Sequence, residues 1–171
     1  MDRAKLPFRS VNRRDTADFQ PGMQRHHLLP RQLASLPAFR EMLRDVGLRC
    51  IGFYDFRANG MLLPATENAV MRTHLPLHRG PHRLYNDMVA DRFGQIEAHW
   101  QALRGAAPAC ARREAAWRIA LLQGALRRRL LQRGRHAVLL NRRDPFRGDV
   151  DFTELDGMVE RLWASTAIAG D

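Results

Sequence analysis

Histidine is unevenly distributed along this chain of 171 residues, and that distribution constrains the fold more than any other feature. Five of the seven histidines lie within residues 24–86, and they are His26, His27, His74, His78 and His82. Imidazole both ligates divalent metal ions and exchanges a proton near neutral pH. A fold that uses this chemistry has to bring the adjacent pair close to later histidines that are spaced four residues apart. One cluster could then supply a metal site and a general base together.

The pattern of apolar residues along the rest of the chain predicts a mostly helical α+β protein. Apolar residues recur at helical spacing, and glycine and proline separate these apolar stretches. Thr66 and Pro81 are placed as helix starts, since threonine caps a helix N-terminus and proline fits its first position. Helices are expected over residues 37–46, 66–72, 81–103, 111–133 and 153–163. Strands are expected over residues 23–29, 48–53, 61–63 and 137–140.

The charge balance favours a polyanionic partner. Lysine and arginine number 28 against 18 acidic residues, which gives a net charge of +10 and a pI near 11.3. Such an excess attracts nucleic acid, an anionic membrane surface or an acidic protein. Lys5 is the only lysine, and arginine suits bidentate phosphate contact, although a GC-rich genome gives the same bias. Ten arginines against the single acid Glu114 in residues 112–143 form either a phosphate-binding run or a solvated helix face.

Several classes of protein are disfavoured. Cys50 and Cys110 are far apart, so neither a disulfide framework nor a thiolate zinc site is expected, and both are expected to be buried. No membrane span is expected, since even the apolar run of residues 115–126 is interrupted by Arg118 and Gln123. Residues 1–10 lack the apolar segment of a signal peptide. The expected location is the cytoplasm, or a target cell into which the protein is delivered.

Three motifs carry a resemblance to a known family. They are Arg25-His26-His27-Leu28-Leu29-Pro30, Asn59-Gly60-Met61-Leu62-Leu63-Pro64, and Leu77-His78-Arg79-Gly80-Pro81-His82 with Tyr85-Asn86. In this order they resemble the AHH nuclease family of the HNH (ββα-metal) endonuclease superfamily, which occurs widely as toxin domains of bacterial polymorphic toxin systems. The resemblance covers about residues 24–95 and implies a small ββα-metal core surrounded by helices. Arg25 departs from the pattern, because the family usually has a small residue there.

The resemblance implies a role for each motif. His27 would be the general base that takes a proton from the attacking water, and Asn59 would orient His27 or tie down its loop. Tyr85 would either belong to the core or touch the phosphate or the metal-bound water. One divalent ion (Mg, Mn, Ni or Zn) would be held by His26, His78 and His82. The segment from His74 to Gly80 also resembles the end of the colicin DNases, and on that alignment His74 would replace His82 as a ligand.

The domain organisation expected from these patterns has three parts. Residues 1–22 form a basic arm, either a disordered leader or a phosphate-contacting segment. Residues 23–104 form the nuclease domain, and residues 109–171 form a basic helical extension packed on it. The expected substrate is DNA, with RNA as the alternative, and the toxin context would add an acidic immunity protein as partner. Two other functional hypotheses stay open: a non-catalytic nucleic-acid-binding module, and a basic adaptor for an acidic protein.

Overall fold

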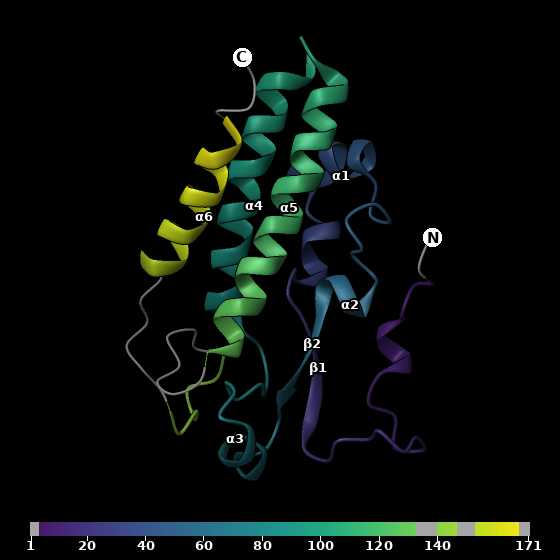
Figure 1. The fold of residues 1–171 in the computed structure, drawn as a ribbon, viewed down its shortest axis with the longest axis vertical. Coiled ribbons are helices and arrows are strands. Elements are labelled where there is room, and N and C mark those ends of the chain that lie inside the picture. Colours follow the sequence, from purple (N-terminus) through teal and green to yellow (C-terminus); the bar gives the residue numbers. More distant parts are fainter. Residues whose placement is uncertain (1–3, 133–139, 147–152, 168–171) are drawn as a thin grey trace.

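The structure, a computed structural model, describes residues 4–132, 140–146 and 153–167. A two-stranded sheet with short helices packs beside a group of long helices, so the expected mostly helical α+β class is confirmed (Figure 1). In chain order, with η for a 3-10 helix, the elements are η1 (Phe8–Ser10), β1 (Met23–His27), η2 (Arg31–Ala34), η3 (Pro37–Phe39), α1 (Arg40–Val46), α2 (Phe56–Asn59), β2 (Gly60–Pro64), α3 (Glu67–Thr73), α4 (Arg83–Arg104), α5 (Pro108–Leu131) and α6 (Thr153–Ala167).

Strands β1 and β2 form an antiparallel pair in which Met23 lies opposite Pro64 and His27 lies opposite Gly60. Neighbouring side chains along a strand point to opposite faces. His26 is therefore buried, whereas His27 is only half-buried on the other side. Gly60 is required where the strands begin to pair, because a Cβ atom there would lie 2.3 Å from the ring of Phe56. The sheet thus presents the two adjacent histidines to two different environments.

Helix α5, one of the long helices, connects the region of the sheet with the other long helices. It packs against α4, α6, α1 and α2. The side-chain amide of Gln123 donates to the carbonyl oxygen of Ile51 at 3.1 Å and to Oδ1 of Asn59 at 3.4 Å. These buried polar bonds fix the position of the sheet region against the helix, and apolar side chains fill the rest of the interior. The largest fully buried ones in the long helices are Tyr85, Phe93, Ile96, Ile119, Leu122 and Leu126.

The N-terminal arm packs on the sheet region. Leu6 donates its N–H to Asp55 at 3.2 Å and accepts from the N–H of Phe56 at 2.8 Å. Asn12 donates to the backbone carbonyl oxygens of Gln20 at 3.1 Å and Met23 at 3.0 Å. The expectation of a disordered leader is therefore wrong for residues 4–22.

All five expected helices are present, with shifted ends, and the first turn of the one expected from Pro37 is a 3-10 helix. Thr66 caps α3 as expected, since its Oγ1 accepts from the N–H of Ala69 at 3.3 Å. Helix α4 begins at Arg83 rather than at Pro81. The strand expected over residues 137–140 lies outside the described residues except for Leu140. Among the described residues, every helix is too short or too polar to serve as a membrane span.

Two further expectations, on residues 48–53 and on the cysteines, are wrong. Residues 48–53 form consecutive turns instead of a strand, because Gly52 adopts a φ of +60° and the N–H of Phe53 bonds to Leu48 at 3.0 Å. The alternating burial of Ile51 and Phe53 comes from this looped path rather than from a strand. Both cysteines are exposed rather than buried.

Candidate active site

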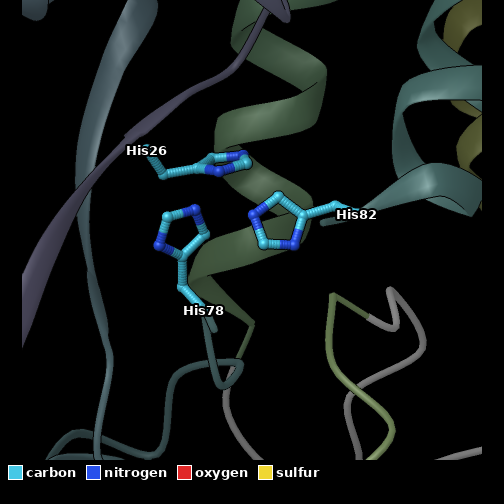
Figure 2. A group of neighbouring side chains, drawn as sticks. All are labelled: His26, His78 and His82. Atoms are coloured by element: carbon cyan, nitrogen blue, oxygen red, sulfur yellow. The ribbon is translucent and has the colours of Figure 1, made fainter. Parts of the chain in front are cut away.

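Three histidines from two segments converge at one point (Figure 2). His26 comes from β1, His78 from the segment between α3 and α4, and His82 from the residue that precedes α4. Their ring centroids are 4.8 Å apart for His26 and His78, 5.7 Å for His26 and His82, and 4.4 Å for His78 and His82. One nitrogen atom of each ring lies within 4.8 Å of the others. That spacing approaches the roughly 4 Å that separates two ligand atoms on opposite sides of one ion.

Neither His78 nor His82 lies within a helix, although their spacing of four residues would place them on one face of a helix. His78 is in an extended segment whose backbone is tied to the sheet, because its N–H donates to the carbonyl oxygen of Pro64 at 2.6 Å. Nδ1 of His82 lies 3.0 Å from the carbonyl oxygen of Leu140. A carbonyl oxygen only accepts, so Nδ1 carries the proton and Nε2 keeps its lone pair for a metal ion.

The triad of His26, His78 and His82 has the chemistry of a metal-binding set. Nε2 of His26 and Nδ1 of His78 are buried and have no hydrogen-bond partner among the described residues. Buried polar atoms normally form hydrogen bonds. Two neighbouring buried nitrogens without a hydrogen-bond partner therefore favour a site in which both bind a metal ion. Burial lowers the pKa of His78 to about 4, with the charges of His82 and His27 adding to it. The pKa of His26 also lies well below its usual range, mainly through burial, so both rings are in the neutral form that ligates metals.

His27 lies on the other face of β1 from His26 and stacks on the aromatic ring of Phe8. The two rings stack with centroids 3.7 Å apart and an angle of 5° between their planes. Burial, followed by the positive charges of Arg31 and Arg25, lowers the pKa of His27 to about 4. The ring is therefore neutral at neutral pH and free to accept a proton. Phe8 belongs to the arm for which a disordered leader and a phosphate-contacting segment were the two expectations. The available signal for its packing was Leu6-Pro7-Phe8, an apolar run in a polar arm.

Asn59 is completely buried and holds the loop after β1. Its Oδ1 accepts from the N–H of Leu29 at 2.7 Å, and its Nδ2 donates to the carbonyl oxygens of Leu29 at 3.2 Å and Phe53 at 2.9 Å. Its own carbonyl oxygen accepts from the N–H of Leu28 at 2.9 Å. Of the two roles expected for Asn59, these bonds serve the tying of the loop rather than the orientation of His27.

Tyr85 and His74 lie where the sequence left alternatives open. The hydroxyl group of Tyr85 donates to the carbonyl oxygen of Leu28 at 2.7 Å, and its ring packs against His26 with centroids 5.0 Å apart. Tyr85 thus belongs to the core and supports His26 from behind. His74 ends α3 in the left-handed conformation, with a φ of 56°, and its ring packs on Phe146. The structure groups His82, and not His74, with His26 and His78.

Comparison with known proteins gives the family. Residues 8–113 match the model of AHH, described as a nuclease family of the HNH/ENDO VII superfamily with conserved AHH, and this stretch is more than half of the chain. The chain belongs to the AHH nuclease family. No curated protein and no solved structure matches it significantly. Membership implies a nucleic acid substrate, and the nucleases of this superfamily are generally metal-dependent, which agrees with the histidine triad.

This chain departs from the family pattern at Arg25, and the match to the family model does not reach the loop that contains Leu140. Where the family has alanine, this chain has Arg25, which is exposed and donates to the carbonyl oxygen of Phe8 at 3.0 Å. The larger residue therefore ties the arm to the strand that carries both histidines. The match includes the arm from Phe8 and the start of α5, but it ends before Leu140, whose carbonyl oxygen meets His82. Nothing in the residue type at position 140 could have revealed that contact, because the acceptor is a backbone atom.

Proposed function

We propose that this AHH protein is a metal-dependent endonuclease that hydrolyses phosphodiester bonds in DNA. The observation that carries the proposal is the pair of orphaned nitrogens on His26 and His78, beside the free nitrogen of His82. His26, His78 and His82 would hold one divalent ion. That ion, when bound, would supply positive charge to the scissile phosphate and to the leaving oxygen.

His27 would act as the general base. Its neutral ring takes a proton from a water molecule, the water oxygen forms a bond to phosphorus, and the bond from phosphorus to the leaving oxygen breaks. A base with a pKa of about 4 is weak at neutral pH. An anionic phosphate beside the ring favours the imidazolium form and raises that pKa towards the working range. Phe8 would fix the plane of the ring, so the accepting nitrogen is positioned before the substrate arrives.

Asn59 is a positioning residue in this proposal. The two histidines stand at the end of β1, and the bonds of Asn59 to Leu28, Leu29 and Phe53 hold the backbone that follows them. Loss of these bonds would loosen both histidines without removing either functional ring. The expected acidic immunity protein stays a prediction of the resemblance, and the net charge of +10 is the property of the chain that favours it.

The test is nicking of plasmid DNA with added Mg²⁺, Mn²⁺, Ni²⁺ or Zn²⁺ by the wild type and by His27→Ala. The wild type is expected to cut with at least one metal. His27→Ala is expected to lose about 10²- to 10⁴-fold in rate, the usual contribution of a general base, while keeping metal and DNA binding. Equal inertness of both proteins with every metal favours the non-catalytic binding module. Equal cutting by both removes His27 from the role of base.

A further inference from the structure

Residues 140–146 follow α5 and lie beyond the stretch matched by the family model, yet they are bonded to the segment that carries His78 and His82. Besides the contact of His82 with Leu140, the side-chain amide of Asn141 donates to the carbonyl oxygen of Arg79. The buried Asp144 accepts from the N–H of Leu77 at 2.8 Å. These bonds attach loop 140–146 to the residues on both sides of His78, so the loop is a fixed neighbour of the triad.

A cleft of about 350 Å³ lies between loop 140–146 and the start of α4. His82 lines it, so the cleft adjoins the triad. Its cationic lining consists of Arg79, Arg83, Arg142 and Arg143, and among the residues that the structure describes no acidic one lines it. All four guanidinium side chains are exposed, and within the described residues none of them forms an ion pair. Four like charges around one cleft repel one another, and an anion bound between them would relieve that repulsion.

These arginines differ from three of those along α5, which are engaged within the chain. Arg118 pairs with Glu114 at 2.7 Å, Arg127 donates to the carbonyl oxygen of Arg57 at 2.7 Å, and Arg129 donates to Gln132 at 2.5 Å. The arginine-rich run of residues 112–143 is therefore not one continuous phosphate-binding face. Within its described part, the cations that gather beside the triad are those at positions 142 and 143.

We propose that this cleft, formed by residues 79–84 and 140–143, binds the phosphodiester backbone of the substrate next to the phosphate that is cut. The proposal rests on the proposed nuclease function and deepens it, because it assigns substrate binding to a loop outside the family match. Guanidinium groups bind phosphate oxygens in pairs of hydrogen bonds. Contacts of this kind give affinity that depends on salt and not on base sequence. The backbone is expected to be that of DNA.

Direct binding measurements test the cleft without relying on cleavage. Fluorescence anisotropy is recorded for a short labelled DNA duplex and full-length protein in the His27→Ala background. The protein is loaded with a metal that supports nicking by the wild type, or with Zn²⁺ if none does. Arg142→Ala/Arg143→Ala is expected to weaken binding about tenfold and to make the slope of log K against log salt shallower by about 2, because two phosphate contacts are lost.

The matched control is Arg112→Ala/Arg113→Ala. Both of these arginines are exposed near the start of α5, at the other end of the long helices from the cleft, and the variant loses the same charge (Figure 1). Its affinity is expected to stay within about twofold of the parent. Arg142→Lys/Arg143→Lys keeps the charge and is expected to recover most of the salt slope, which separates lost contacts from a disturbed loop. Equal losses for the two alanine pairs, or no loss for the cleft pair, overturn the proposal.

The outcomes separate this inference from the nuclease assignment. If the wild type cuts no substrate but the cleft pair alone weakens DNA binding, the cleft stands and the assigned activity fails. If the wild type cuts DNA while the cleft variant binds and cuts normally, the activity stands and the cleft fails. Repeating the titration with an RNA duplex identifies the backbone: a loss with DNA supports the proposal, and a loss with RNA alone overturns its assignment to DNA.

Discussion

His26 and His27 are neighbours in one strand, yet they have opposite surroundings. His26 is buried between two other imidazoles and the ring of Tyr85, and its free nitrogen has no partner among the described residues. His27 is half-buried and stacks on Phe8 with arginines nearby. The strand alternation that separates two adjacent side chains would therefore give one sequence motif the two proposed chemical functions, a ligand on one face and a base on the other.

The difference between the two faces also lies in what holds each ring. The inner face is fixed by the core and by backbone bonds, such as those of Tyr85 to Leu28 and of His78 to Pro64. The outer face is fixed by the N-terminal arm, whose Phe8 is bound to β1 through Arg25. A change on one face is therefore expected to leave the other largely intact.

The largest expected effect is on metal affinity, and it separates the two histidines. His26→Ala removes one of the three proposed ligands. It is expected to weaken metal binding by more than about a hundredfold, since losing even a residue that supports a ligand costs 10- to 100-fold. His27→Ala is expected to bind metal as the wild type does. Titration calorimetry with Zn²⁺ measures both, and His74→Ala is the matched control, with unchanged affinity expected. If His74→Ala lost as much metal affinity as His26→Ala, His74 would be a ligand and the assignment of His82 as the third ligand would be wrong.

The sequence predicted the inner face better than the outer one. Helical spacing, the cap at Thr66 and the three motifs identified the main helices and the histidines that converge, because these signals reside in residue types. The start of α4 at Arg83 could not be read in the same way, since Pro81 is an equally good first residue. The bonds that hold the site, from Pro64 to His78 and from Leu140 to His82, use backbone carbonyl oxygens and leave no mark in the sequence.

The second effect concerns the outer face. Phe8→Leu keeps an apolar side chain but removes the stacked ring, so it is expected to lower kcat by about ten- to a hundredfold through loss of positioning, with little change in KM or metal affinity. Phe8→Trp restores a stacking partner and is expected to recover activity. Phe19→Leu, in the same arm, is the control. The comparison is measured by nicking kinetics, and normal kcat in a folded Phe8→Leu protein would reduce the stack to simple packing.

The arm itself shows why the outer face was missed. A polar, basic segment at the start of a chain is usually disordered, and residues 1–22 carry little to distinguish them from that pattern. The structure orders residues 4–22 through a few hydrogen bonds between backbone and side-chain atoms, including those of Leu6 and Asn12, and through one aromatic contact. Contacts of this type become visible only when the position of β1 is known.

The smallest expected effect is a loss of stability of the metal-free protein on acidification, to which both faces contribute. An unfolded histidine takes up its proton near pH 6.5, whereas the pKa values of folded His27 and His78 are about 4 and that of His26 is also lowered. Between about pH 6.5 and 4 the unfolded chain binds more protons than the folded one. Stability is therefore complete above pH 6.5 and falls as the pH decreases through this window. Thermal unfolding in chelator across that range measures it.

The contributions of the two faces to this loss of stability between pH 6.5 and 4 can be measured separately. His27→Gln removes one titrating ring from the outer face, so its melting temperature is expected to fall less steeply with acidification than that of the wild type. Saturating Zn²⁺ competes with protons only at the triad, so it is expected to raise the melting temperature at pH 7 and to steepen the loss on the inner face. The contribution of His27 should persist in both conditions. If the melting temperature depends on pH in the same way in wild type and His27→Gln, protonation of His27 is not coupled to folding.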